Sequence, residues 1–394
     1  MGKNKKFAVM YGAGNIGRGF IGQVFHDSGF EVVFIDVNKD LVSALNEKGS
    51  YTQLIIEGEG DGNRIEQREI SGVRAIDGLD FESVAREIAA CDIMAVSVGA
   101  AALSQIAPFI AGGLTRRKAP LNILVCENQA DAPKILRGGV LECLSEHLSE
   151  SSVLSDSSAL NRVGFVGASI GRMVPVVPIS QRLSDPTLIA VEKFCNLPID
   201  GDAIIEPMPK LMFTTLCSPF AFEEDKKLYI HNMSHSLAAY LGALKGYKYI
   251  WQAMDDESVR VLVQKAMNVS ADALVRKYNK NEDDLSRYVA DLLIRFGNKG
   301  LGDTVKRVGG DPLRKLAPND RLIGTLDLCK EQGLDYSCIL SGVAAALQFY
   351  VPDDPSAGQL QKRLKESGRS TFLRDYCGLS EADIERCLGM RLHK

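Results

Sequence analysis

Three polar side chains recur at helical spacing in the segment KLYIHNMSH, residues 227–235. At about 100° per residue of an α-helix, Asn232 lies roughly 140° and His235 roughly 80° from Lys227, so all three fit one broad face. A lysine beside an apolar wall loses solvation, which disfavours its charged form and lets it act as a base. The pattern indicates a general base assisted by an amide and an imidazole. The alternative is a solvated face on which Lys227 and His235 point into water.

A glycine-rich turn near the N-terminus indicates a second kind of site. An apolar run at 7–11 stops at the turn, and helical spacing follows it. In such a turn the first glycine permits tight bending, the second admits a pyrophosphate, and the third lets the helix pack closely. The helix N-terminus offers unpaired N–H groups to phosphates. We therefore expect these residues to bind a dinucleotide: Gly12, Ala13, Gly14, Asn15, Ile16 and Gly17.

An acidic residue supports the dinucleotide interpretation. Residues 31–36 (EVVFID) have the pattern of a second strand, and Asp36 ends it 19 residues after Gly17. A carboxylate there accepts hydrogen bonds from the adenosine ribose and repels a 2′-phosphate, which favours NAD over NADP. The alternative is an acid that only terminates the strand. We expect Asp36 to contact the cofactor.

Two further strands should end at the same edge of the sheet. Residues 91–99 (CDIMAVSVG) and 121–125 (LNILV) are apolar runs of strand length. Because loops at the carboxyl ends of a doubly wound sheet face the cofactor, Val98 and Gly99 should pass beside it. Asn128 would reach the same edge and donate to a substrate oxygen. On local sequence alone, Asn128 as a helix N-cap is the favoured alternative.

Isolated cations mark possible anion sites. Arg172 is the single charge within residues 163–177, and a buried arginine is usually paired with a protein carboxylate or an anionic ligand. Neither partner is favoured here. Arg314, Lys315 and Arg321 lie in the loop GGDPLRKLAPNDR, where they could reach a substrate phosphate or only cap helix ends.

Composition limits the classes of partner. The chain has 394 residues, 45% of them hydrophobic and 24% charged, with a net charge of −4. These values favour a globular protein whose partner is a small molecule rather than a nucleic acid or a membrane. No secretory signal is visible, and nine scattered cysteines without CxxC spacing indicate free thiols in the cytosol. No metal-ligand cluster is found, so we expect metal-independent chemistry.

The order of the patterns predicts two domains. Residues 1–205 should form a Rossmann-type doubly wound sheet, with β excursions at 51–75, and bind the dinucleotide. Residues 206–394 should form an all-α domain that carries the substrate and catalytic groups. The helical stretches are expected at 225–244, 255–278, 282–296, 321–332 and 337–350.

Taken together, four segments resemble the polyol-specific long-chain dehydrogenases, the mannitol dehydrogenase family. They are GAGNIGRGFIG, CENQAD at Cys126, KLYIHNMSHSLAAYLG at Lys227 and DPLRKLAPNDRL at Asp311. The resemblance implies a Rossmann domain followed by a helical domain, NAD(P) without metal, and a lysine base. By motif it assigns the base to Lys227, the two asparagines to Asn128 and Asn232, and the histidine to His235.

The resemblance implies an NAD-dependent enzyme that interconverts a sugar alcohol, expected to be mannitol 1-phosphate, and its ketose, fructose 6-phosphate. Gly171 stands where the family usually has an aspartate before the arginine, which leaves the polyol open. Alternatives are a hexuronate (tagaturonate or fructuronate) reductase, an unphosphorylated mannitol 2-dehydrogenase, a β-hydroxyacid dehydrogenase, or an NADH-sensing module without chemistry. A monomer or a weak homodimer is expected.

Overall fold

The computed structural model describes residues 6–59, 62–129, 131–150, 160–177 and 179–391. It divides into two compact units. Unit 1 comprises residues 1–57 and 64–223, and unit 2 comprises residues 58–63 and 224–394. Each unit is described by itself.

A six-stranded parallel sheet forms the centre of unit 1. Its order is β5-β2-β1-β6-β7-β8, so the chain reverses its direction of sheet growth between β1 and β6. Loops on either side of such a reversal point create the ligand crevice of doubly wound folds. The strands are β1 (Phe7–Tyr11), β2 (Glu31–Asp36), β5 (Val73–Asp77), β6 (Ile93–Val96), β7 (Leu121–Val125) and β8 (Val163–Gly167).

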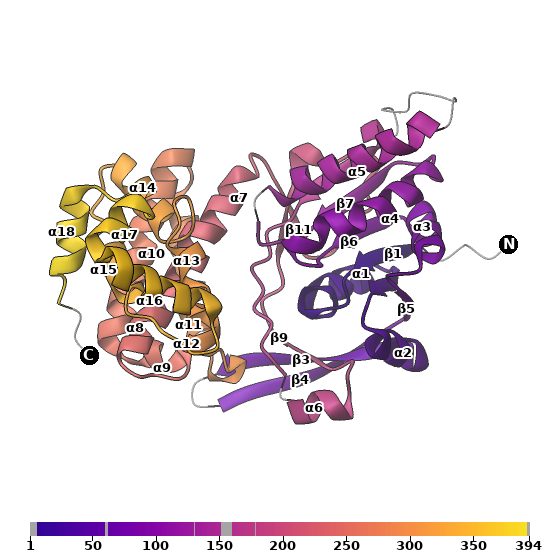
Figure 1. Ribbon diagram of the computed structural model, residues 1–394. Helices are drawn as coiled ribbons and strands as arrows, with labels where there is room; N and C mark the ends of the chain where they lie inside the picture. The colour runs from indigo at the N-terminus through magenta and orange to yellow at the C-terminus, as the bar shows by residue number, and fades with distance from the viewer. Residues whose placement is uncertain (1–5, 60–61, 130, 151–159, 178, 392–394) are drawn as a thin grey trace. The chain divides into compact units, whose positions relative to one another are not determined.

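Helices cover both faces of this sheet, which explains why its strands are apolar throughout. Alternate residues of β1 enter separate cores: Met10 packs with Val24 of α1, and Val9 packs with Ile88 of α3. Figure 1 shows α3, α4 and α5 together on one side of the sheet. The helices of unit 1 are η1 (Gly17–Ile21), α1 (Gly22–Asp27), α2 (Lys39–Lys48), α3 (Phe81–Ala90), η2 (Ala100–Ala102), α4 (Leu103–Thr115), α5 (Ala132–Glu150), η3 (Leu160–Arg162), α6 (Ile179–Ser184) and η4 (Gly201–Ala203).

Two smaller sheets complete unit 1. A three-stranded sheet has the order β4-β3-β9, in which β3 (Ser50–Glu59) and β9 (Ile189–Glu192) are parallel and β4 (Gly62–Ser71) is the other neighbour of β3. A parallel pair joins β10 (Leu197–Asp200) and β11 (Thr214–Cys217). The excursions predicted at 51–75 are therefore present, whereas β9, β10 and β11 are too short to stand out in the sequence.

Unit 2 is helical. Several helices begin at side chains suited to the N-cap: Asp256 caps α10, Asn281 caps α11 and Ser380 caps α18. A single long helix runs from α7 (Ala221–Asp225) through η5 (Lys226–Asn232) into α8 (Met233–Leu244). The remaining helices are α9 (Ile250–Asp255), α10 (Glu257–Tyr278), α11 (Glu282–Phe296), η6 (Lys299–Leu301), α12 (Val305–Gly309), α13 (Pro312–Lys315), α14 (Ile323–Glu331), α15 (Ser337–Ala346), α16 (Pro355–Ser367), α17 (Arg369–Asp375) and α18 (Glu381–Gly389).

These features confirm the predicted fold class, a Rossmann-type sheet with extra strands followed by a helical region. The helix predicted at 282–296 has the same bounds in the structure, and the one at 255–278 begins two residues later. One expectation is wrong: residues 226–232 are wound as a π-helix and not as an α-helix. The sequence analysis did not predict the three C-terminal helices, α16, α17 and α18.

Candidate active site

Steric limits in the glycine turn of unit 1 match the three roles expected of its glycines. Gly12 has φ +98°, and a Cβ atom there would lie 2.1 Å from the Ser97 carbonyl oxygen. A Cβ atom on Gly17 would lie 1.9 Å from the Gly12 carbonyl oxygen. Gly14 differs, because a Cβ atom there would meet nothing within 4 Å. The first and third glycines are therefore required by the fold, whereas the second keeps open space above the turn.

Asp36 is tied directly to the turn. Its Oδ2 accepts a hydrogen bond of 2.7 Å from the Ala13 backbone N–H, and its Oδ1 accepts one of 2.9 Å from the Asn38 N–H. The carboxylate is held at the carboxyl end of β2, beside the exposed residues Gly14 and Asn15. Each oxygen keeps a second lone pair, so both remain able to accept a ribose hydroxyl.

Glu127 is a residue that the sequence analysis missed. Its Oε1 accepts hydrogen bonds from the backbone N–H groups of Val98 (2.8 Å) and Gly99 (2.9 Å). Burial raises the pKa of Glu127, and the same two hydrogen bonds oppose that shift. The carboxylate links the loop after β6 to the loop after β7, which carries the exposed Asn128. Because the backbone N–H groups of Val98 and Gly99 already donate to Glu127, these residues would contact a cofactor through their other atoms.

The open space at Gly14 would admit the pyrophosphate of a dinucleotide. A pyrophosphate needs a concave backbone surface free of side chains, followed by a helix N-terminus. Asn15 and Ile16 begin that helix, and the following segment η1 is π-wound, with the Gly22 N–H bonded to the Gly17 carbonyl. π-Segments often occur at functional sites. The turn, Asp36 and the loop at 98–99 thus lie at the carboxyl ends of neighbouring strands β1, β2 and β6.

Replacing Gly14 with alanine should separate binding from folding. We expect wild-type thermal stability, with NADH binding weaker by roughly 10- to 100-fold, because the added methyl would occupy the space left for the pyrophosphate. Gly17→Ala is the matched control and should lower the melting temperature, because its methyl meets the Gly12 carbonyl. Fluorescence titration and calorimetry measure the two effects. Unchanged NADH affinity in Gly14→Ala would refute the placement of the pyrophosphate.

Two arginines near the turn are engaged by the protein itself. The buried Arg18 donates from Nε to the Ala13 carbonyl (2.6 Å) and from Nη1 to the Thr187 carbonyl (2.6 Å). Arg172, 4% exposed, donates to the Glu192 carbonyl from Nε (2.9 Å) and Nη2 (2.8 Å), and from Nη1 to the Gln23 Oε1 (2.7 Å) and the Gly19 carbonyl (3.0 Å). These contacts favour a protein-paired Arg172 over a substrate ligand.

The π-helix η5 carries two of the predicted catalytic residues of unit 2. Its winding is evident where the Met233 N–H bonds to the Leu228 carbonyl, five residues earlier. In such a helix, residues five apart lie nearly one above the other, so Lys227 and Asn232 share one side more closely than an α-helix would allow. Both side chains are half-buried. Buried hydroxyls of Ser270 and Thr325 donate to the Tyr229 carbonyl at 2.7 and 3.5 Å, which braces the segment.

His235, one turn further along α8, is fixed by two contacts. Its ring stacks on Phe296, with centroids 4.5 Å apart and planes at 17°. Its Nε2 lies 3.1 Å from Oδ2 of Asp303, which the sequence analysis also missed. The neighbouring His231 is buried, and burial lowers its pKa well below the usual range, with smaller contributions from Arg295, Lys227 and Arg321. Lys227 and Arg321 thus act electrostatically on the same neutral imidazole.

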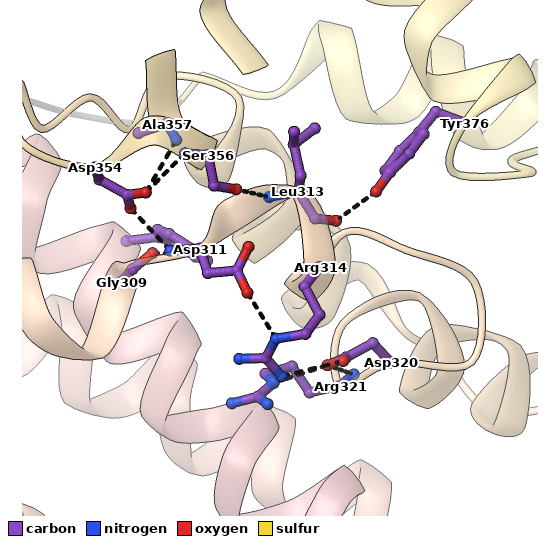
Figure 2. Close-up of polar contacts among 11 residues, drawn as sticks. Gly309, Asp311, Leu313, Arg314, Asp320, Arg321, Asp354, Ser356, Ala357 and Tyr376 are labelled. Atoms are coloured by element: carbon purple, nitrogen blue, oxygen red, sulfur yellow. Dashed lines mark hydrogen bonds and ion pairs between the residues drawn. The ribbon is translucent and has the colours of Figure 1, made fainter. Parts of the chain in front are cut away.

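Two of the cations predicted to meet a phosphate, Arg314 and Arg321, share a carboxylate partner in unit 2 (Figure 2). Arg314 donates from Nε to Asp311 (2.7 Å) and from Nη1 to Asp320 (3.5 Å), and Arg321 donates from Nε to Asp320 (2.8 Å). Within the part of the chain that the structure describes, these guanidinium groups bond to carboxylates rather than to helix-end carbonyls. Lys315 is 5% exposed, and burial, reinforced by Arg321 and Arg314, lowers its pKa to about 7. Asp311 and Asp320 are bonded by Arg314 and Arg321, and the buried Lys315 lies under the electrostatic influence of all four groups.

The structure assigns the predicted catalytic residues to different units. Lys227, Asn232 and His235 belong to unit 2, whereas Asn128 belongs to unit 1. Among the described residues, no group of three His, Cys, Asp or Glu side chains is arranged to hold a metal ion. Within the same residues, no helix has the length and apolar character needed to cross a membrane.

Comparison with known proteins covers nearly the whole chain. Residues 6–212 match the family model of the mannitol dehydrogenase Rossmann domain, and residues 220–381 match that of the mannitol dehydrogenase C-terminal domain. Mannitol-1-phosphate 5-dehydrogenase of Thermoanaerobacter pseudethanolicus is 36% identical over 95% of this chain and 94% of its own. The enzyme of the same name from Bacillus velezensis is 38% identical over 94% and 95%, respectively.

Solved structures support the same architecture. Pseudomonas fluorescens mannitol 2-dehydrogenase, in a ternary complex with NAD and D-mannitol, has a TM-score of 0.77 at 17% identity and covers 98% of this chain and 91% of its own. A D-sorbitol dehydrogenase has a TM-score of 0.78 at 16% identity, with coverage of 98% and 92%. At these identities the likeness shows the fold alone. The two family models and the relatives of 36 to 38% identity show that the chain belongs to the mannitol dehydrogenase family.

Proposed function

We propose that this protein is an NAD-dependent oxidoreductase that interconverts mannitol 1-phosphate and fructose 6-phosphate. The observation that carries the proposal is its 36 to 38% identity to mannitol-1-phosphate 5-dehydrogenases over about 95% of the chain. Relatives that match along their full length share the cofactor domain and the substrate domain. The cationic cluster of unit 2 supports a phosphorylated substrate.

NAD is the cofactor that the residues of unit 1 suit. The turn from Gly12 to Gly17 would hold the pyrophosphate, and Asp36 would accept hydrogen bonds from the adenosine ribose. Because the Asp36 carboxylate is fixed by the Ala13 and Asn38 N–H groups, it cannot turn away from a 2′-phosphate, which disfavours NADP. When bound, the nicotinamide supplies the acceptor and donor of hydride. All other steps belong to side chains of the chain itself.

Lys227 is proposed as the general base. In the oxidative direction its amine takes the proton of the secondary hydroxyl as the carbon of that hydroxyl loses hydride. Asn128 and Asn232 donate hydrogen bonds to the same oxygen and stabilise the negative charge that develops there. His235 binds a neighbouring hydroxyl. In ketose reduction the protonated Lys227 returns the proton, so the two directions should depend oppositely on one titration.

The phosphate of the substrate is proposed to bind Arg314, Lys315 and Arg321. A guanidinium group suits a phosphate because it offers parallel N–H donors at the spacing of two phosphate oxygens. Asp311 and Asp320 hold the two arginines in place through hydrogen bonds. The remaining N–H groups of each guanidinium would donate to the phosphate. Lys315, with a pKa of about 7, gains a proton most readily when an anion arrives beside it.

Charge reversal in this cluster should weaken phosphate recognition selectively. In Arg314→Glu we expect KM for fructose 6-phosphate to rise by roughly 10- to 100-fold, because a charged hydrogen bond of about 1.5–3 kcal/mol is replaced by repulsion. KM for unphosphorylated fructose should change little. Lys306→Glu, an exposed cation of α12 paired with Asp353, is the matched control. Equal changes in KM for both sugars would remove the phosphate assignment.

A substrate panel tests the proposed activity. Oxidation of NADH should be fastest with fructose 6-phosphate, compared with fructose, tagaturonate and fructuronate. Preference for a hexuronate would indicate a sugar-acid reductase, and preference for fructose a mannitol 2-dehydrogenase. Tight NADH binding without turnover of any of the four would identify a nicotinamide-sensing module and refute the enzyme proposal.

We also propose a division of roles along the chain. Residues 1–205 would serve the cofactor and residues 206–394 the substrate and catalysis. The nine cysteines, all free in the structure, support a reducing compartment, and the cytosol is the proposed location. A monomer or a weak homodimer is the proposed assembly, which sedimentation analysis across a concentration series would test.

A further inference from the structure

We propose that Asp303 is a positioning residue that places the proton of His235 on Nε2, so that His235 meets the polyol as a hydrogen-bond acceptor through Nδ1. The identity of the ligand rests on the proposed function. Asp303 lies in the loop before α12, 68 residues after His235 in sequence. The two side chains are 14% and 10% exposed, and Nε2 of His235 and Oδ2 of Asp303 are 3.1 Å apart.

The charge of Asp303 follows from its other contacts. Burial alone would raise its pKa, but His235 and Arg307 outweigh burial and hold the pKa below its usual range. The carboxylate is therefore an anion at neutral pH. Arg307 donates from Nε to Oδ1 at 2.7 Å and bonds the same oxygen through Nη2, so the carboxylate cannot rotate away from His235.

The facing nitrogen of His235 must carry a proton. An unprotonated Nε2 would point its lone pair at a carboxylate oxygen 3.1 Å away, which is repulsive. The two buried atoms lie 3.1 Å apart, and among the described residues neither has another hydrogen-bond partner. The contact therefore disfavours a neutral ring protonated on Nδ1, so that a neutral His235 is the Nε2–H form.

The ring plane is fixed independently of Asp303. Phe296 stacks on one face of the imidazole, and the neutral His231 lies with its ring centroid 6.0 Å away. With the plane and Nε2 both fixed, the lone pair of Nδ1 has a defined direction. A lone pair accepts a hydrogen bond from a hydroxyl and repels a carbonyl oxygen. His235 would thus require a hydroxyl group at the substrate position that it contacts, which makes Asp303 a determinant of specificity.

Nuclear magnetic resonance of the unaltered protein tests the proton position directly. Protein labelled with ¹⁵N-histidine contains five imidazoles, and His235→Gln identifies the signals of His235 by their loss. We expect a neutral ring protonated on Nε2. A ring protonated on Nδ1, whether on that nitrogen alone or on both nitrogens, would overturn the proposal. Because this experiment needs no substrate, its outcome is independent of whether the proposed reaction is correct.

A double-mutant cycle tests the effect on catalysis. Asp303→Asn should lower kcat/KM for the polyol by roughly 10- to 100-fold, as removal of partners behind functional histidines does. In a His235→Ala background the same change should cost less than about threefold, because the ring on which it acts is gone. Asp303→Glu, which keeps the charge, should recover part of the loss. Asp291→Asn, a half-exposed acid of α11 paired with Arg295, is the control and should be neutral.

A purely structural Asp303 would give a different result. Its loss would reduce kcat/KM by the same factor with and without His235, and the melting temperature would fall in parallel. Equal factors in the two backgrounds would therefore overturn the proposal. If Asp303→Asn fails to fold, the resonance measurement on the unaltered protein still decides the matter.

Discussion

Replacement of Lys227 with alanine should reduce kcat by about 10²- to 10⁴-fold in both directions, the range expected when a general base is lost. NADH affinity should stay at the wild-type value, because every predicted cofactor contact comes from unit 1. Steady-state rates with fructose 6-phosphate and mannitol 1-phosphate, combined with NADH titration, measure the two quantities. A loss confined to kcat would support a role for Lys227 in the chemical step.

Lys226 provides the matched control for this experiment. It is the preceding residue of the same π-segment, and its Nζ lies 5.1 Å from the centroid of the Tyr288 ring. Lys226→Ala removes an equal charge from an adjacent position, so we expect turnover within about threefold of wild type. Near-normal turnover in Lys227→Ala, or equal losses in both variants, would refute Lys227 as the base.

Replacement of Asn128 with alanine should lower kcat by about 10²- to 10³-fold, the usual cost of removing one donor to a developing oxyanion. KM should change much less, because the hydrogen bond strengthens as charge develops in the transition state. The N-cap position of α5 is not at Asn128, because this helix begins at Ala132. A purely structural Asn128 predicts a different pattern, a loss of stability with turnover unchanged. Kinetics and thermal unfolding together distinguish the two roles.

Gln129 serves as the control for Asn128. It is the next residue, it is also exposed, and it carries the same amide group. Gln129→Ala should leave kcat unchanged. An Asn128→Ala enzyme that loses stability but not rate would give Asn128 a structural role, and the oxyanion would then depend on Asn232 alone.

Much of unit 1 was predictable because its signals are local. The turn at Gly12 to Gly17 requires particular residues at fixed offsets, and steric contact with Ser97 and with the turn itself bears this out. The position of Asp36 follows from the length of one strand. Helical periodicity likewise predicted the long helices of unit 2, since burial of one face repeats every three to four residues.

The hydrogen-bond partners of the charged side chains could not be predicted from the sequence in the same way. From the sequence, Arg172 suited a ligand and a protein partner equally well. In the fold it donates to the backbone carbonyls of Glu192, 20 residues away in sequence, and Gly19, 153 residues away. Glu127 was passed over although it lies beside Asn128, because its role depends on the loop after β6. The π-winding of η5 was also unforeseen, since its side chains would suit an α-helix equally well.

The sequence by itself determined the two kinds of domain, the dinucleotide turn and the motif that bears Lys227, Asn232 and His235. These depend on residue type and spacing over a few turns of chain, which short-range sterics and periodic burial translate directly into local structure. Only the tertiary structure decided that Asp303 faces His235 and that the arginines at 314 and 321 pair with aspartates. Such contacts join residues whose separation in sequence carries no information about their separation in space.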